Sequence, residues 1–201
     1  MIEKHNEHGL DLHMLFIDFK QAFDSINRER LFGAMDRMGI PQQLIRLIRM
    51  TMCQTKARVK TDNQISAPFE FNKGVKQGDC RSTTLFILPL HNAAQEIDQR
   101  GTIYTKSSQI SAYTDDVVIV PRSESRLRQI YRETEEKPQQ MGLTVNEKKT
   151  KHMIVSATQM GRQTQNWKVG DKVFERVSSL TYLGNVIYKE GRISECVKDR
   201  T

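Results

Sequence analysis

The chain has 201 residues, of which 37% are hydrophobic and 27% charged, so it can form one large domain or one domain with an appendage and is not polar enough to be disordered. No apolar run approaches the roughly 18 residues of a membrane span, and the N-terminal residues do not form a signal peptide, so we expect an intracellular protein with no membrane partner. Lys and Arg outnumber Asp and Glu by 31 to 24, and this net charge of +7 favours a polyanionic partner such as nucleic acid, although many basic domains bind none.

The first elements expected along the chain are a strand and two helices. The segment 13–19 predicts a mostly buried strand that ends on the carboxylate of Asp18. A helix is expected over 27–38 with Gly39 as its stop, and a second helix begins at Pro41, because proline suits the first turn. Four apolar side chains of this second helix are expected to face inward: Leu44, Leu47, Ile48 and Met52.

A hairpin, a loop and a helix are expected next. Residues 57–61 and 68–71 are predicted to pair around Asp62–Asn63. The glycine-bearing loop 73–79 then leads to a helix expected from Ser82 to about residue 100.

The middle of the chain carries a second hairpin signal. Two short strands are expected over 109–114 and 117–121, with Asp115–Asp116 as the two residues of the tip. A helix from about Ser123 follows and is expected to end at Pro138.

The last part adds a strand over 152–156, a polar linker over 157–165, a hairpin around Gly170–Asp171 and a helix start near Ser194. The order of strands and helices predicts an α+β fold, in which an antiparallel sheet is backed by helices and carries a small C-terminal hairpin extension.

Asp18 and the pair Asp115–Asp116 end apolar strands that lie far apart in the sequence. Each site alone is explained by ordinary turn or capping chemistry, in which aspartate is common. If the two strands share a sheet, however, the carboxylates gather at its edge, where a divalent cation must compensate their charge. Mg²⁺ prefers a few carboxylates together with substrate phosphate oxygens, and two such ions support in-line displacement at phosphorus.

Five blocks of this sequence resemble, in the same order, the conserved blocks of the reverse transcriptases of non-LTR retrotransposons. Each block is modest alone, the Asp-Asp pair especially, whereas the ordered set is strong. The blocks span Phe16–Ile26, Gly74–Asp79, Ala112–Asp116, Gly142–Lys151 and Tyr182–Gly184.

The resemblance implies a polymerase palm and assigns its metal site. Asp18 and Asp115 would be the catalytic, metal-binding pair, with Asp116 as the supporting acid of the same block. Phe19 would offer its backbone carbonyl to a metal ion. The implied cofactor is a pair of Mg²⁺ ions, with Mn²⁺ as an alternative.

The resemblance also implies a nucleotide site, with an RNA template, a DNA primer and deoxynucleoside triphosphates as partners. Phe23 matches the bulky residue that crowds the sugar 2′-position, although a core aromatic beside a strand end explains it equally well. Gln77 and Gly78 would lie against the incoming nucleotide and the template, although a plain turn also explains Gly78. Lys149 aligns best with the lysine that approaches the triphosphate.

The chain departs from the family pattern after the Gln-Gly pair. Arg81 replaces a leucine and Thr83 a proline, and we expect a charge at a position that the family buries to tilt the following helix. Thr114 in place of alanine is a milder change. Because only seventeen residues precede Asp18, we expect a palm with largely missing fingers over 1–156, and a linker, a hairpin and the start of a thumb over 157–201.

Two functions are therefore open. The first is RNA-directed DNA synthesis by two-metal nucleotidyl transfer, which the intact aspartates favour, and the second is a catalytically inactive, nucleic-acid-binding remnant, which the truncation and Arg81 favour. An unrelated RNA-recognition sheet is set aside, because its strand motif is absent. We expect the isolated chain to be weak or inactive as an enzyme, since two aspartates without fingers and thumb cannot align primer, template and nucleotide. A nuclear location is expected from the chromosomal targets of such elements.

Overall fold

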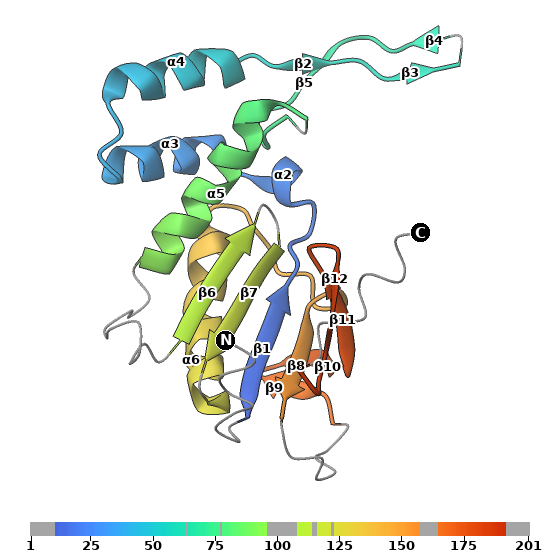
Figure 1. Cartoon of the computed structure of the whole chain (residues 1–201). Helices are drawn as coiled ribbons and strands as arrows, with labels where there is room; N and C mark the ends of the chain where they lie inside the picture. The colour runs from blue at the N-terminus through green and yellow to red at the C-terminus, as the bar shows by residue number, and fades with distance from the viewer. Residues whose placement is uncertain are drawn as a thin grey trace.

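The protein is built around a six-stranded sheet with the strand order β6-β7-β1-β8-β10-β9 (Figure 1). The computed structural model describes residues 11–62, 64–76, 78–95, 108–113, 116–121, 123–156 and 165–191. The pairings within the sheet are antiparallel except for the parallel pair β8–β10. The strands are β1 (Leu12–Ile17), β6 (Ser108–Tyr113), β7 (Asp116–Pro121), β8 (Lys151–Val155), β9 (Trp167–Val169) and β10 (Lys172–Arg176).

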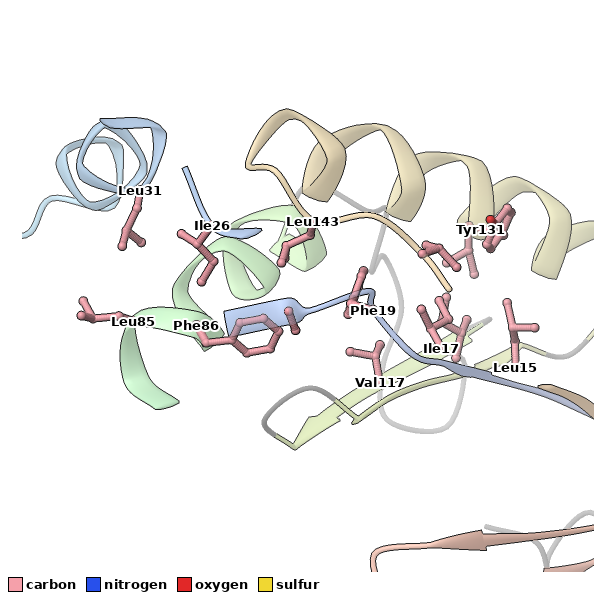
Figure 2. Close-up of a cluster of buried hydrophobic side chains, with 14 of the residues drawn as sticks. Leu15, Ile17, Phe19, Ile26, Leu31, Leu85, Phe86, Val117, Tyr131 and Leu143 are labelled. Atoms are coloured by element: carbon pink, nitrogen blue, oxygen red, sulfur yellow. The ribbon is translucent and has the colours of Figure 1, made fainter. Parts of the chain in front are cut away.

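The central strand β1 is apolar except for His13, and both faces of the sheet are covered around it. Leu15 and Ile17 pack into the larger cluster with residues of α6 (Glu124–Gln140), among them Leu127, Ile130 and Tyr131 (Figure 2). The alternate residues of β1 belong to a second cluster, which the C-terminal hairpin β11 (Ser179–Tyr182) and β12 (Asn185–Tyr188) completes. The expected buried strand and its helix-backed sheet are therefore confirmed.

The remaining helices are α2 (Ala22–Ser25), α3 (Arg28–Arg37), α4 (Gln42–Met52) and α5 (Cys80–Gln95). The boundaries of α3 match the expectation, because the side chain of Asn27 accepts a hydrogen bond from the Arg30 amide and Gly39 takes a φ of +75° after the helix. The helix α6 runs past Pro138, where the sequence predicts its end. Only two helical residues follow this proline, so the backbone donor that it lacks lies at the C-terminal end of the helix.

The inward face predicted for α4 is wrong in part. Leu44 and Leu47 are exposed, whereas Ile45 and Met52 are buried and Ile48 is half-buried. Apolar residues occur on more than one side of this helix, and α3 lies against only one of them (Figure 1). The prediction of burial is therefore wrong for Leu44 and Leu47.

The hairpin expected at 57–71 forms an extension that projects beyond α4 (Figure 1). It consists of two short ladders, in which β2 (Lys56–Ala57) pairs with β5 (Phe69–Glu70), and β3 (Lys60–Thr61) pairs with β4 (Gln64–Ile65). We refer to residues 55–71 as the hairpin arm.

The C-terminal part of the chain adds to the main sheet. The hairpin around Gly170–Asp171 is confirmed as β9 and β10, and β10 joins the sheet beside β8. Trp167 and Phe174 of this hairpin are buried in the larger cluster. Residues 157–164 of the linker expected over 157–165 lie outside the described residues, as does the expected helix start near Ser194. No helix of the described part is long and apolar enough to cross a membrane.

Candidate active site

Asp18 directly follows β1, and the register of the sheet brings it to the same edge as Asp116. The last pair between β1 and β7 is Ile17 with Val117, so one further step sets Asp18 opposite Asp116. Asp116 is the first residue of β7 and pairs with Tyr113 of β6. The sheet thus unites two acidic positions that are distant in the sequence, as the strand pattern predicts.

The hairpin tip differs by one residue from the expectation. Residues 114 and 115 lie between β6 and β7, and Asp116, which was predicted in the tip, belongs to the strand. Asp115 itself lies outside the described residues. Within the described part of the chain, no three His, Cys, Asp or Glu side chains gather as a metal site, and the predicted set includes Asp115.

The backbone of Asp18 is held by the segment that precedes β8. Its amide donates a hydrogen bond to the buried hydroxyl of Thr150 at 3.2 Å, and its carbonyl accepts one from the Asn146 amide at 2.8 Å. The side-chain oxygen Oδ2 is buried and has no hydrogen-bond partner among the described residues. Because an uncompensated buried carboxylate oxygen is costly, this geometry suits a cationic ligand.

Phe19 forms an isolated bridge with Val145 beyond the end of β1. The neighbouring hydrogen bonds use the Lys20 amide, which donates to the Thr144 carbonyl, and the Asp18 carbonyl, so the bridge does not use the Phe19 carbonyl. The Phe19 ring is buried and meets the ring of Phe86 edge-on at 6.5 Å. The side chain therefore belongs to the core, while the metal-binding role of its carbonyl stays a prediction.

Phe23 lies in α2 and is half-buried, with its ring 5.0 Å from that of Phe86 in α5. This contact agrees with the view of Phe23 as a core aromatic. Its remaining exposure leaves room for the predicted contact with a nucleotide sugar, which stays a prediction.

The loop that begins at Gly74 is packed against α2. Its φ is +77°, and a Cβ there would lie 2.8 Å from the backbone of Asp24, so only glycine fits. The Gly74 amide donates to the Ile26 carbonyl at 2.7 Å, and the Val75 amide donates to the Phe23 carbonyl at 2.8 Å. The first and second blocks of the sequence are therefore joined by backbone contacts.

The loop also contains Gln77 and Gly78, for which contacts with the nucleotide and the template are predicted. Gly78 has a φ of +87° and is exposed, and a Cβ there would meet nothing within 4 Å. A turn therefore explains its conformation, and the contact with nucleotide and template stays a prediction. Gln77 lies outside the described residues.

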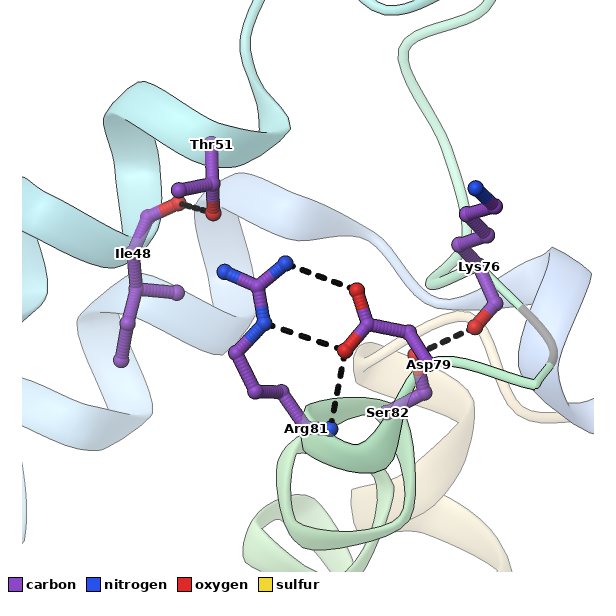
Figure 3. Close-up of polar contacts among 6 residues, drawn as sticks. All are labelled: Ile48, Thr51, Lys76, Asp79, Arg81 and Ser82. Atoms are coloured by element: carbon purple, nitrogen blue, oxygen red, sulfur yellow. Dashed lines mark hydrogen bonds and ion pairs between the residues drawn. The ribbon is translucent and has the colours of Figure 1, made fainter.

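Arg81 does not occupy the buried position that its alignment suggests. Its guanidinium donates to both carboxylate oxygens of Asp79, at 3.1 and 2.7 Å, and more than half of its side chain is exposed (Figure 3). Asp79 also accepts a hydrogen bond from the Arg81 amide at 3.0 Å, and the Ser82 hydroxyl donates to the Lys76 carbonyl. The expected tilt of α5 by a buried charge is thus corrected, because the charge is paired at the surface.

The segment after α6 packs against the backbone at the end of α2. Gly142 has a φ of +90°, and a Cβ there would lie 2.3 Å from the Ser25 carbonyl oxygen. The Asn27 amide donates to the Met141 carbonyl at 2.9 Å. Lys149 is exposed one residue before Thr150, whereas Lys151 is paired with Glu175. The predicted contact of Lys149 with the triphosphate stays a prediction.

Two residues at this site were missed in the sequence analysis. Thr150 lies between the lysines of its block and carries no signal of its own in the sequence, although its hydroxyl accepts the hydrogen bond of the Asp18 amide. Tyr182 packs on Phe16 of β1 at 5.4 Å, and burial raises the pKa of its phenol, with the negative charge of Asp116 acting in the same direction. The Tyr-Leu-Gly turn could have suggested Tyr182, while only the tertiary contact identifies Thr150.

Comparison with known proteins agrees with the family that the five blocks resemble. The family model described as "Reverse transcriptase (RNA-dependent DNA polymerase)" matches residues 2–187. An R2 retrotransposon Pol polyprotein of Bradysia coprophila is 27% identical over 76% of this chain and 18% of its own length. The transposon TX1 149 kDa protein of Xenopus laevis is 27% identical over 56% of this chain and 9% of its own length. The chain thus spans less than a fifth of these relatives.

Solved structures show the same fold. A telomerase from Candida tropicalis in complex with a fragment of telomeric RNA matches all of this chain and 32% of its own, with a TM-score of 0.71 and 14% identity. An apo telomerase of the same organism, truncated from the C-terminal domain, matches 93% of this chain and 36% of its own, with a TM-score of 0.64 and 17% identity. At this level of identity, the likeness shows a shared palm-like architecture.

Proposed function

Because the chain belongs to the reverse transcriptase family, with relatives among the Pol proteins of non-LTR retrotransposons, we propose that its sheet edge carries out RNA-directed DNA synthesis. One observation supports this most directly. The oxygen Oδ2 of Asp18 is buried without a partner among the described residues, at the edge where the register sets Asp18 opposite Asp116.

In this proposal the chain's own residues orient the reacting groups. Thr150 and Asn146 fix the backbone of Asp18, and the strand register sets Asp18 opposite Asp116. The proposal adds the carboxylate of Asp115 to these two. Gly74 and Gly142 join the segments around this edge by close backbone approach. Such preorganisation is what a polymerase palm must supply, because the reaction depends on alignment of the primer hydroxyl with the nucleotide.

Reverse transcriptases use divalent metal ions, and the residues present fit them. The carboxylates of Asp18 and Asp115 and the carbonyl of Phe19 are hard oxygen ligands, which suit Mg²⁺ and also Mn²⁺. When bound, two such ions would supply positive charge to the attacking and leaving oxygens. Phe23, Gln77, Gly78 and Lys149 would contact the deoxynucleoside triphosphate.

The test is primer extension on poly(rA) with an oligo(dT) primer, Mg²⁺ and dTTP. Because the chain alone is expected to be a weak enzyme, we expect weak extension by the wild type, and we expect Asp115→Ala and Asp18→Asn to abolish it. The matched control is Asp171→Asn, which removes an exposed hairpin-turn carboxylate far along the chain and should extend like the wild type.

Equal extension by the wild type and both site variants would contradict the proposal. If the folded wild type binds the primer–template in a salt-sensitive manner but does not extend it, the chain is a nucleic-acid-binding remnant and the enzymatic proposal fails.

A further inference from the structure

The hairpin arm projects from the body of the protein, and no other element that the structure describes packs along most of its length (Figure 1). The register pairs Lys56 with Glu70 and Ala57 with Phe69 near its base, and Lys60 with Ile65 near its tip. Between these ladders, Val59 and Ser66 exchange hydrogen bonds, in which the Ser66 amide donates to the Val59 carbonyl and the Val59 amide to the Ser66 hydroxyl. The arm is thus a two-stranded ribbon, in which the returning strand has one more residue between the two ladders than the outgoing strand.

The base of the arm is fixed by the buried side chain of Arg28. Its guanidinium donates to the hydroxyl of Thr55 at 3.0 Å on the outgoing strand and to the carbonyl of Phe71 at 3.2 Å on the returning strand. Its Nε donates to the carbonyl of Gly74 at 2.8 Å. The direction of the arm is therefore set relative to the Gly74–Asp79 loop.

The two faces of the arm differ in charge. The outgoing strand has no extra residue between its ladders, so the two-residue alternation places Lys56, Arg58 and Lys60 on one face, about 6.6 Å apart along the strand. Ala57, Val59 and Thr61 then lie on the opposite face. All three cations are exposed.

Only one of these three cations is neutralised within the arm. Lys56 lies 3.5 Å from Glu70, and both side chains are more than half exposed. Arg58 and Lys60 form no ion pair with the residues that the structure describes. A row of exposed cations on a narrow ribbon is complementary to one polyanionic backbone.

We propose that this basic face of the hairpin arm binds the phosphate backbone of single-stranded RNA on its way to the active site. That the bound nucleic acid is RNA rests on the proposed function, whereas the row of exposed cations does not depend on it. The arm returns directly into the loop that begins at Gly74, so a strand bound along it is led toward that loop. A single row of charges matches one backbone rather than a duplex, and it reads no base sequence.

The test measures binding without chemistry. The full chain is titrated with a fluorescein-labelled 20-nucleotide oligo(U) in EDTA, without nucleotides, at salt concentrations from 50 to 200 mM. We expect Arg58→Ala/Lys60→Ala to reduce the slope of log affinity against log salt by about 1.4, because each lost phosphate contact removes about 0.7 for a single strand. Between 50 and 200 mM salt, the wild type should therefore lose about seven times more affinity than this double variant.

Two further variants keep the test independent of folding. Glu70→Gln removes the negative charge and releases Lys56, so we expect tighter binding and a slope steeper by about 0.7, a gain that unfolding cannot produce. Arg132→Ala/Lys168→Ala removes two exposed cations elsewhere and should leave the slope unchanged.

Equal slopes for the arm double variant and the wild type, equal losses in both double variants, or no gain from Glu70→Gln would overturn the inference. If oligo(U) and a duplex of the same length show the same dependence on the arm, the preference for a single strand is wrong. Arm-dependent binding by a chain that fails in primer extension would refute the enzymatic proposal alone.

Discussion

Gly142 offers a direct measure of how closely the segments around the site approach one another. It lies between α6 and β8 with a φ of +90°, and a Cβ at this position would come within 2.3 Å of the Ser25 carbonyl oxygen. Real Cβ atoms essentially never come closer than 3.0 Å to such an atom, so Gly142→Ala must move the backbone of one segment. The contact involves two backbones, which cannot be relieved by a side-chain rotation.

The expected loss of stability has two parts. A left-handed φ costs an alanine about 1–2 kcal/mol. Relieving the overlap by a shift of packed backbone costs about 1–3 kcal/mol. We therefore expect Gly142→Ala to lower the free energy of unfolding by about 2–5 kcal/mol, which for a chain of this length corresponds to about 5–15 °C in Tm.

Gly39→Ala is the matched control, because Gly39 has a φ of +75° and a Cβ there meets nothing within 4 Å. It should lose only the conformational part, about 1–2 kcal/mol. Urea unfolding can be followed by the emission of Trp167, the one tryptophan, which is buried in the folded chain. If both variants lose the same stability, the close approach of Gly142 to Ser25 does not exist in solution and the reasoning is refuted.

Two other predictions concern the buried imidazole of His152 and the exposed ion pair between Asp79 and Arg81. Burial, aided by the charge of Arg176, lowers the pKa of His152 to about 3, and neither ring nitrogen has a partner among the described residues. The unfolded chain takes up this proton below a pH of about 6.5 and the folded chain does not, so stability falls as the pH falls through the window from 6.5 to 3. Between pH 7 and pH 5.5 the wild type should lose about 1 kcal/mol more than His152→Leu in urea unfolding, and parallel losses would show that His152 does not titrate this way. Asp79→Ala should cost about 1 kcal/mol, because the Arg81 amide at the start of α5 loses its acceptor, whereas Arg81→Leu should cost less than half of that, since an exposed pair contributes little. Thermal melts of the two variants decide this, and a larger loss in Arg81→Leu would contradict it.

The sequence alone determined the features whose causes are local. The strand β1 could be predicted because five of its six residues are apolar and can be buried on both faces, and its end at Asp18 followed from the first carboxylate. The limits of α3 follow from Asn27 and Gly39, whose capping and left-handed conformations depend on neighbours within a few residues. The hairpin around Gly170–Asp171 has the same local origin. The order of the five blocks identified the family without any contact being known.

The tertiary structure decided which side chains face the core and which positions meet. The helix α4 has apolar side chains on more than one side, so the position of α3 decides that Ile45 is buried and that Leu44 is exposed. The register of β6 and β7 places Asp116 in a strand, because cross-strand pairing continues where the sequence pattern suggests a turn. Thr150 meets Asp18 across 132 positions of the chain. Such contacts depend on how separate elements pack, and no periodicity or capping signal within one segment encodes them.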